Sequence, residues 1–326
     1  MGGHNMSEFL RESFNESKTM YSGHNEALVE LGDEHPDVLI LYADFAQGQA
    51  GLYYRKNYPE RIINMGIAEA NLMTVAAGLA EGGKIPFTHC HSIFAVGRTY
   101  NQIRQIAFDR YNVNIILCNT GMFWDFMGAS HQVIEEIAAL RVLPNLVLLS
   151  PSDAVEAKKA SKAAAYLDGP VVIRLAEPET PIIYTDDYHF EIGKAALLKE
   201  GKDVTIAATG ILMSKVLQAA KILEREKIDV QVLNFHTIKP LDVETINNSA
   251  RETGAIVTVE DSSVIGGLGG SITEILSENY PIPIHRIGVR DVFGQTGNME
   301  ELATEYSMNT TDIIKAVKNI IKKKRK

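Results

Sequence analysis

The chain has 326 residues, with 32 lysines and arginines against 41 aspartates and glutamates, which gives a formal net charge of −9. This acidic balance argues against a nucleic-acid-binding surface. Two cysteines, Cys90 and Cys118, are too few for a disulfide framework and fit a reducing compartment. Because no apolar run reaches membrane-spanning length and the N-terminus lacks the apolar region of a signal peptide, we expect a cytoplasmic protein that contacts no membrane.

Short apolar strands alternate with amphipathic helices along the first half of the chain. Strands are predicted at residues 37–44, 85–90, 114–119, 146–150 and 171–175, and helices at residues 95–107, 132–141 and 154–166. The last of these helices follows Pro151-Ser152-Asp153, a strong helix start. Such alternation predicts an α/β fold in which helices cover both faces of a mainly parallel sheet.

The segment 61–87 is the most informative in this half. It predicts a helix that opens just after Gly66 and carries one carboxylate, Glu69, among apolar residues. Glu69 has two interpretations. It is an ordinary acid favoured at a helix N-terminus, or it is a carboxylate kept dry so that it can hold a proton against a cofactor ring nitrogen.

A segment rich in proline and acidic residues, 177–189, breaks the alternation and is interpreted as a linker. The alternation then resumes, with strands predicted at 204–208, 230–234, 255–260 and 284–289 and helices at 213–226, 243–252 and 270–279. We therefore predict two domains, residues 1–185 and a smaller domain at residues 186–326. The glycine-rich run 265–271 lacks the spacing of a phosphate-binding loop, so tight turning and close packing explain it better.

Several segments together resemble the C-terminal half of a transketolase, in the form that split enzymes carry as a separate subunit. The quoted strings are GIAEANL at 66–72, GASHQVIEEIAALR at 128–141, NFHTIKPLD at 234–242 and VEDSSVIGGLGG at 259–270. The resemblance covers nearly the whole chain from about Lys18 onward. It implies two doubly wound α/β domains, a pyrimidine-binding domain and a smaller transketolase C-terminal domain.

The resemblance also implies thiamine diphosphate as the cofactor and assigns roles to five residues. Glu69 matches the glutamate that hydrogen-bonds the aminopyrimidine ring and activates the cofactor. Phe94 matches an aromatic residue that packs on that ring, and His91 takes the place of a neighbouring stacking aromatic. His131 matches an active-site histidine, a side chain suited to proton transfer near neutral pH. Asp44 matches an acid near the cofactor.

A transketolase holds the diphosphate and its divalent metal through a Gly-Asp-Gly motif, and no Gly-Asp-Gly occurs in these 326 residues. We therefore expect an N-terminal transketolase subunit to supply that motif and most of the contacts to Mg²⁺ or Ca²⁺. The active unit is then a heterodimer, expected to pair into a heterotetramer, and this chain alone is expected to be inactive. His89 and His91 stand at i, i+2, but two ligands are too few for a zinc site, so no metal site is expected on this chain.

The substrate-facing positions depart from the family pattern. Asn119 stands where a histidine is usual, and Asp125-Phe126-Met127 places Met127 where an aspartate contacts sugar hydroxyls. Tyr21 takes the position of an arginine that meets the substrate phosphate, and only Arg174 is left of the expected phosphate clamp. A thioether cannot accept hydrogen bonds from a sugar hydroxyl in the way a carboxylate does. We therefore expect sugar-like substrates that differ from common pentose and hexose phosphates.

Trp124, the only tryptophan, lies in an apolar loop with Phe123 and Phe126. This loop forms a wall over the cofactor or packs against the partner chain, and we favour the wall.

The predicted reaction is transfer of a two-carbon ketol unit from a ketose donor to an aldehyde or ketone acceptor. One alternative is a 2-oxo-acid-decarboxylating synthase or the β subunit of a 2-oxo-acid dehydrogenase. SHQVIEE and NFHTIKPLD favour the transketolase branch, whereas Met127 and Tyr21 weaken it. A second alternative is a non-catalytic scaffold subunit, against which Glu69 and His131 argue.

Overall fold

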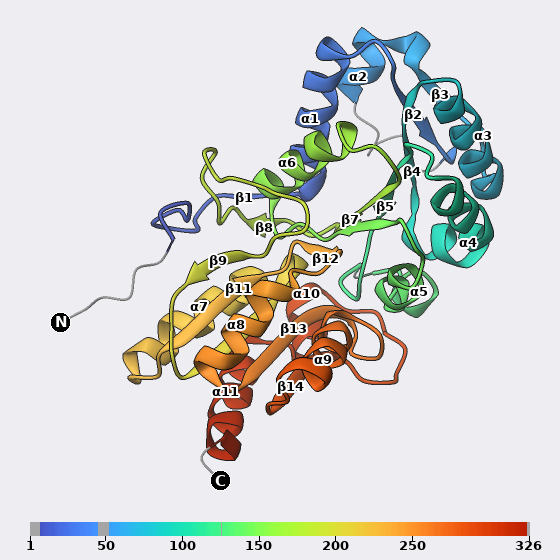
Figure 1. Ribbon diagram of the computed structural model, residues 1–326. Coiled ribbons are helices and arrows are strands. Elements are labelled where there is room, and N and C mark those ends of the chain that lie inside the picture. Colours follow the sequence, from blue (N-terminus) through green and yellow to red (C-terminus); the bar gives the residue numbers. More distant parts are fainter. Residues whose placement is uncertain (1–6, 45–51, 125, 325–326) are drawn as a thin grey trace.

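The computed structural model describes residues 7–44, 52–124 and 126–324, and its described part holds two large β-sheets with helices on both faces (Figure 1). The first sheet, in the blue-to-green half of the chain, lies above the second, in the yellow-to-red half. Within the described residues, a two-stranded ribbon of β1 (Ser17–Lys18) and β8 (Thr180–Pro181) adds a small third sheet. The predicted α/β class is confirmed.

The first sheet has, among the described residues, seven strands in the order β12-β6-β7-β5-β4-β2-β3. Its strands are parallel except for β12, which pairs antiparallel with β6. The bounds are β2 Val38–Tyr42, β3 Ile62–Asn64, β4 Ile85–His91, β5 Asn114–Cys118, β6 Val147–Leu149, β7 Val171–Leu175 and β12 Thr237–Lys239. Every strand predicted for the first half is present, within one or two residues of its predicted ends.

Helices cover both faces of this sheet because successive strand residues point to opposite sides. Ile40 and Ile116 pack with α1 and α6, whereas Leu41 and Leu117 pack with α3, α4 and α5. The helix bounds are α1 Met20–Glu34, α2 Leu52–Asn57, α3 Glu69–Glu81, α4 Ser92–Asp109, α5 Glu136–Arg141 and α6 Ala154–Ala165. Both layers are apolar, as a buried parallel sheet requires.

The second sheet has, in the same described ranges, the order β14-β13-β10-β11-β9, with β9 antiparallel to β11 and the other pairs parallel. Its strands are β9 Ala196–Lys199, β10 Val204–Ala208, β11 Val230–Asn234, β13 Ile256–Ser263 and β14 Ile284–Val289. The helices around it are α7 Met213–Arg225, α8 Val243–Thr253, α9 Leu268–Asn279, α10 Met299–Glu305 and α11 Thr310–Lys324. This half repeats the two-faced layering of the first half.

The two halves share a strand, because β12 lies far along the second half of the chain and completes the edge of the first sheet. The boundary expected at 185/186 falls between β8 and β9, and it stays a prediction. Among the described residues, no helix combines the length and the apolar character needed to cross a bilayer.

Parallel strands bring their carboxyl ends to one edge of a sheet, where ligands of α/β proteins bind. Asp44 follows β2, His91 ends β4 and Asn119 follows β5. Glu69 begins the helix after β3. The topology therefore gathers these predicted site residues at the carboxyl edge of the first sheet.

Candidate functional site at the carboxyl edge of the first sheet

Glu69 is the first residue of α3, close to the predicted helix start. Gly66 has φ +69°, a left-handed conformation that favours glycine and turns the chain from β3 into the helix. The Glu69 side chain is 7% exposed, so its carboxylate is buried at a helix N-terminus, where the peptide dipoles favour negative charge. The helix that the sequence predicts after Gly66 is therefore present and carries Glu69 in its first turn.

Arg98 contacts this buried carboxylate from α4. Its Nη1 donates to Glu69 Oε1 at 3.0 Å and to Oε2 at 3.2 Å, and its guanidinium carbon lies 4.3 Å from the centroid of the Phe94 ring. Phe94 and Arg98 are four residues apart on α4, hence on one face of that helix, and α3 packs beside α4 (Figure 1). A flat group with N–H donors therefore lies between the Glu69 carboxylate and the Phe94 ring.

Four rings form what we call the aromatic cluster: His91, Phe94, Trp124 and His131. His91 stacks on Trp124 at 4.6 Å between centroids, with the planes 23° apart. His131 meets Trp124 edge-on at 5.2 Å and Phe94 at 5.6 Å. Trp124 is buried and lies beside the predicted catalytic histidine.

A polar chain leads from the aromatic cluster to α1. The Tyr21 hydroxyl donates to Asn119 Oδ1 at 2.7 Å and accepts the Asn119 backbone N–H at 2.8 Å. The Asn119 side-chain nitrogen lies 2.9 Å from His91 Nδ1. Asn119 has φ +60°, a conformation uncommon outside glycine that occurs at functional sites. Tyr21 and Asn119 are predicted to contact substrate. In the structure, Tyr21 holds Asn119, and Asn119 in turn contacts and orients the His91 ring.

The charge state of His91 follows from this environment. Burial lowers the pKa of His91 to about 4, and the neighbouring His131 lowers it further than burial alone would. His91 is therefore a neutral imidazole at neutral pH. If the Asn119 amide donates to Nδ1, the ring proton is on Nε2. Burial likewise raises the pKa of the Tyr21 phenol well above its usual value, so it stays a neutral donor.

His131 follows a single 3₁₀ turn, η3 (Gly128–Ser130), and is half-buried. Its Nδ1 lies 2.8 Å from the Ser130 hydroxyl. The next residue, Gln132, donates to the backbone oxygens of Trp124 at 3.3 Å and of Gln295 at 3.0 Å. Gln132 thus joins the loop before His131 to the second half of the chain, a role that the sequence reasoning missed.

Arg174 lies in β7 with its side chain 2% exposed, enclosed by charged and hydroxyl groups. It donates to Glu136 at 2.5 and 2.9 Å, to Asp261 at 3.0 Å, to Ser150 at 2.7 Å and to Ser262 at 3.0 Å. The guanidinium therefore pairs internally and links the two halves of the chain through Asp261, and the predicted contact of Arg174 with a substrate phosphate stays a prediction.

Two other predicted site residues lie apart from these contacts. Asp44 is exposed and has φ +44°. Its backbone N–H donates to Asn64 Oδ1 at 3.2 Å, and its carboxylate accepts from the Asn64 amide at 3.4 Å. Met127 is half-buried and precedes η3. Asp125, quoted with it in the sequence pattern, lies outside the described residues.

Arg98 is the second site residue that the sequence reasoning missed. The sequence did contain a clue to this role, because a buried acid such as Glu69 needs a donor and Arg98 lies one helical turn beyond Phe94. Among residues 7–44, 52–124 and 126–324, no group of three or more histidine, cysteine, aspartate or glutamate side chains could hold a metal ion. Glu69 and Phe94 are placed so that they can hold a planar group with N–H donors, as they hold the Arg98 guanidinium.

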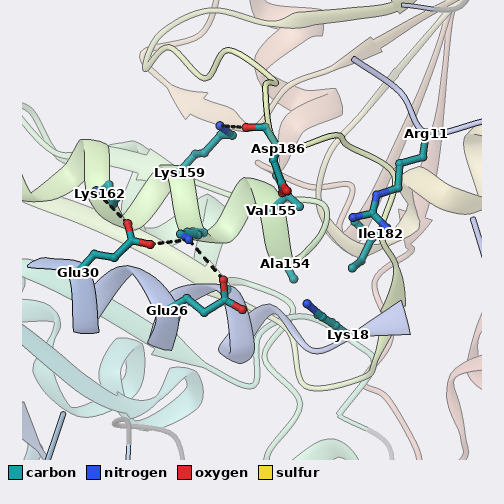
Figure 2. A pocket seen from close by; sticks show the side chains of 12 residues that line it. Arg11, Lys18, Glu26, Glu30, Ala154, Val155, Lys159, Lys162, Ile182 and Asp186 are labelled. Atoms are coloured by element: carbon teal, nitrogen blue, oxygen red, sulfur yellow. Dashed lines mark hydrogen bonds and ion pairs between the residues drawn. The ribbon is translucent and has the colours of Figure 1, made fainter. Parts of the chain in front are cut away.

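A separate cavity of about 550 Å³ lies between α1 and α6, and the described residues that line it include none of those predicted for the site (Figure 2). Two of its lysines are paired with acids on α1: Lys158 lies 2.6 Å from Glu30 and 3.4 Å from Glu26, and Lys162 lies 2.8 Å from Glu30. These ion pairs bridge the two helices, so the cavity is explained by helix packing.

Comparisons with known proteins agree with this geometry. The family model "Transketolase, pyrimidine binding domain" matches residues 16–182, and "Transketolase, C-terminal domain" matches residues 193–313. The chain is 39% identical to the putative transketolase C-terminal section of Methanocaldococcus jannaschii, covering 94% of this chain and 97% of that protein. It is 38% identical to the 6-deoxy-6-sulfo-D-fructose transketolase subunit SqwH of Clostridium sp. (strain MSTE9), covering 92% and 93%.

A third relative is an apulose-4-phosphate transketolase subunit of Phocaeicola vulgatus, 35% identical and covering 91% of this chain and 96% of that protein. Among solved structures, a split-gene transketolase described as an inactive beta4 tetramer superimposes with a TM-score of 0.88 at 44% identity. The match covers 95% of this chain and all of that one (100%).

Proposed function

Because this chain belongs to the transketolase family, we propose that it is the subunit of a two-chain, thiamine-diphosphate-dependent enzyme that carries the pyrimidine-binding and C-terminal domains. The enzyme transfers a two-carbon ketol unit from a ketose donor to an aldehyde or ketone acceptor. The observation that carries the proposal is the buried Glu69 carboxylate beside the Phe94 ring, at the carboxyl edge of the first sheet.

The residues around Glu69 fit the aminopyrimidine end of thiamine diphosphate. The site already accepts a planar group whose N–H donors reach Glu69 while its face lies over Phe94. When bound there, the cofactor would supply a carbon nucleophile that adds to a ketone carbonyl and takes up the electrons of the adjacent C–C bond as it breaks. Glu69 would hold the proton shared with the ring nitrogen, and Phe94 would fix the plane of the ring.

The aromatic cluster serves the substrate side of the reaction. His131 is half-buried between Phe94 and Trp124, where it can move a proton to or from the substrate oxygen. His91 stays neutral and is oriented by Asn119. Trp124 and Phe94 limit access of water to this region. Asp44 completes the cofactor side in this proposal.

The partner of this chain is an N-terminal transketolase subunit that carries the Gly-Asp-Gly motif and binds the diphosphate and Mg²⁺ or Ca²⁺. The descriptions of relatives as a C-terminal section, as subunits and as a split-gene enzyme support this arrangement. The complex is a heterotetramer, and the isolated chain is inactive.

The substrate is a sugar-like ketose other than the common pentose and hexose phosphates. Two relatives are described as transketolase subunits for a sulfonated fructose and for apulose 4-phosphate. In this chain, Arg174 pairs with Glu136 and Asp261, which supports a substrate contact that differs from the usual phosphate clamp. Met127 cannot accept a hydrogen bond from a sugar hydroxyl as an aspartate would, and this also supports an unusual substrate.

The test is ketol transfer by the complex of this chain with its N-terminal partner. Xylulose 5-phosphate, 6-deoxy-6-sulfofructose and apulose 4-phosphate are offered as donors, with pyruvate as a control donor. We expect transfer from 6-deoxy-6-sulfofructose or apulose 4-phosphate and little from xylulose 5-phosphate, whose ready use would contradict the proposed substrate class. Glu69→Gln should lower kcat on the order of 10²- to 10⁴-fold. The matched control Glu81→Gln, at the exposed end of the same helix, should keep full activity. Carbon dioxide release from pyruvate without ketol transfer would contradict the proposal.

A further inference from the structure

Arg98 occupies the space between Glu69 and Phe94 in the structure of this chain. Its guanidinium donates to both carboxylate oxygens, at 3.0 and 3.2 Å, and its centre lies 4.3 Å from the Phe94 centroid. The same two residues are those that bind the aminopyrimidine in the proposed function. One side chain therefore makes, at once, both contacts that the cofactor ring would make.

The chemistry of the two groups is alike. A guanidinium is planar, carries N–H donors in its plane and stacks on aromatic faces. An aminopyrimidine is also planar, presents N–H donors along one edge and stacks on an aromatic ring. Glu69 is 7% exposed, so a carboxylate left without a donor there is costly to bury. Either the guanidinium or the aminopyrimidine can donate to the Glu69 carboxylate, but the two groups cannot occupy the same position at once.

The Arg98 side chain is free to leave, because it is 52% exposed. A half-exposed ion pair contributes little to stability, since the charged group regains water when it swings outward. The side chain also starts from α4, whose apolar face (Ala95, Thr99 and Ile103) is buried independently of Arg98. Release of Arg98 therefore leaves the packing of the helix intact.

We propose that Arg98 is an internal competitor of the cofactor pyrimidine ring for Glu69 and Phe94, and that it must be displaced when the cofactor binds. The inference rests on the proposed function, because it assumes that the pyrimidine ring binds at Glu69. Before cofactor binds, Arg98 keeps the buried carboxylate paired. When it binds, Arg98 swings into solvent, so the residue lowers the apparent affinity for the cofactor.

The experiment is a calorimetric titration of thiamine diphosphate with Mg²⁺ into the two-chain complex. Arg98→Met removes the donors and the charge but keeps an apolar stem. We expect its Kd to fall by about three- to tenfold, the combined effect of a partly exposed ion pair and a cation–π contact. Arg98→Lys keeps the charge but lacks the planar guanidinium, so its Kd should lie between those of the parent and Arg98→Met. Arg104→Met, an exposed residue of α4, should bind as the parent does.

A second readout separates competition from a purely structural effect. Because the competing ion pair is partly exposed, raising the salt concentration should shrink the ratio of the parent Kd to the Arg98→Met Kd. Equal or weaker binding by Arg98→Met would overturn the competition and leave the proposed function standing. Absence of cofactor binding by the parent complex and every variant would overturn the proposed function, and this inference with it.

Discussion

At the residue scale, two buried charged side chains have opposite surroundings. Glu69 has one charged contact among the described residues, with a half-exposed arginine that can leave. Arg174 is enclosed by Glu136 and Asp261. Both stand out in the sequence as charges inside apolar runs. Their partners do not, since Glu136 and Asp261 are 38 and 87 residues from Arg174 and meet it only in the fold.

The enclosed position of Arg174 predicts a large loss of stability on Arg174→Met. The substitution leaves two buried carboxylates without a counter-charge, a change that typically costs about 3–5 kcal/mol. Urea unfolding of the isolated chain measures it. The surface control Arg104→Met should change the free energy of unfolding by less than about 0.5 kcal/mol. A loss for Arg174→Met as small as that of the control would show that the guanidinium is not needed in the fold.

Glu136 predicts a pH dependence. Burial, the main cause, raises its pKa from 4.5 to about 7, although Arg174 acts in the opposite direction. Between these values the folded chain keeps a proton that the unfolded chain has released. The stability that this proton supplies is complete below about pH 4.5 and is lost as the pH rises through about 7.

Glu136→Gln removes that titration. Between pH 5 and 8, the free energy of unfolding of the parent should fall relative to that of the variant by roughly 1–3 kcal/mol. Urea unfolding at intervals of one pH unit provides the difference curve, in which all other titrations cancel. Parallel curves for the two proteins would mean that Glu136 does not titrate in this window.

At the element scale, the periodic apolar segments were predictable and the long-range pairings were not. The strand predicted at 171–175 is β7 to the residue. By contrast, β12 comes from the motif NFHTIKPLD, which carries no strand periodicity, and it becomes a strand only by pairing with β6. The helix predicted at 132–141 begins only at Glu136, and Gln132, which was expected in it, donates instead to the Trp124 backbone oxygen.

The packing of α1 against α6, on one face of the first sheet, gives a further prediction. A Cβ added to Gly23 of α1 would lie 1.8 Å from the Ala154 carbonyl oxygen of α6. Since that contact is with backbone, the two helices would have to separate, and Gly23→Ala should lower stability by at least about 2 kcal/mol. Gly78→Ala in α3 meets nothing within 4 Å and should be neutral or stabilising by up to about 1 kcal/mol. Thermal unfolding of both variants tests these two predictions. Equal Tm values would show that the contact between α1 and α6 tolerates a methyl group.

At the scale of the whole molecule, the two halves are joined beside the site. β12 completes the first sheet, Arg174 reaches Asp261, and Gln132 donates to Gln295. The Gln132 bond holds the segment next to His131 against the second half of the chain. The sequence predicted two halves and a set of site residues, whereas the links between the halves depend on contacts that no local pattern encodes.

The whole molecule is also, in the proposed function, one part of a larger site. Glu69, Phe94 and His131 serve the pyrimidine and substrate end, and the partner grips the diphosphate. Mixing the two purified subunits should therefore produce activity that neither shows alone, and activity should saturate at a 1:1 ratio of chains. Ketol transfer by this chain without a partner would contradict that division of labour.

The most direct measurement is calorimetry of thiamine diphosphate with Mg²⁺, titrated into this chain, into its partner and into their complex, each with parent Glu69 and with Glu69→Gln. We predict tight uptake by the parent complex, none by this chain alone, and clearly weaker uptake by the Glu69→Gln complex. Uptake by the complex that does not change when Glu69 is replaced would contradict this prediction.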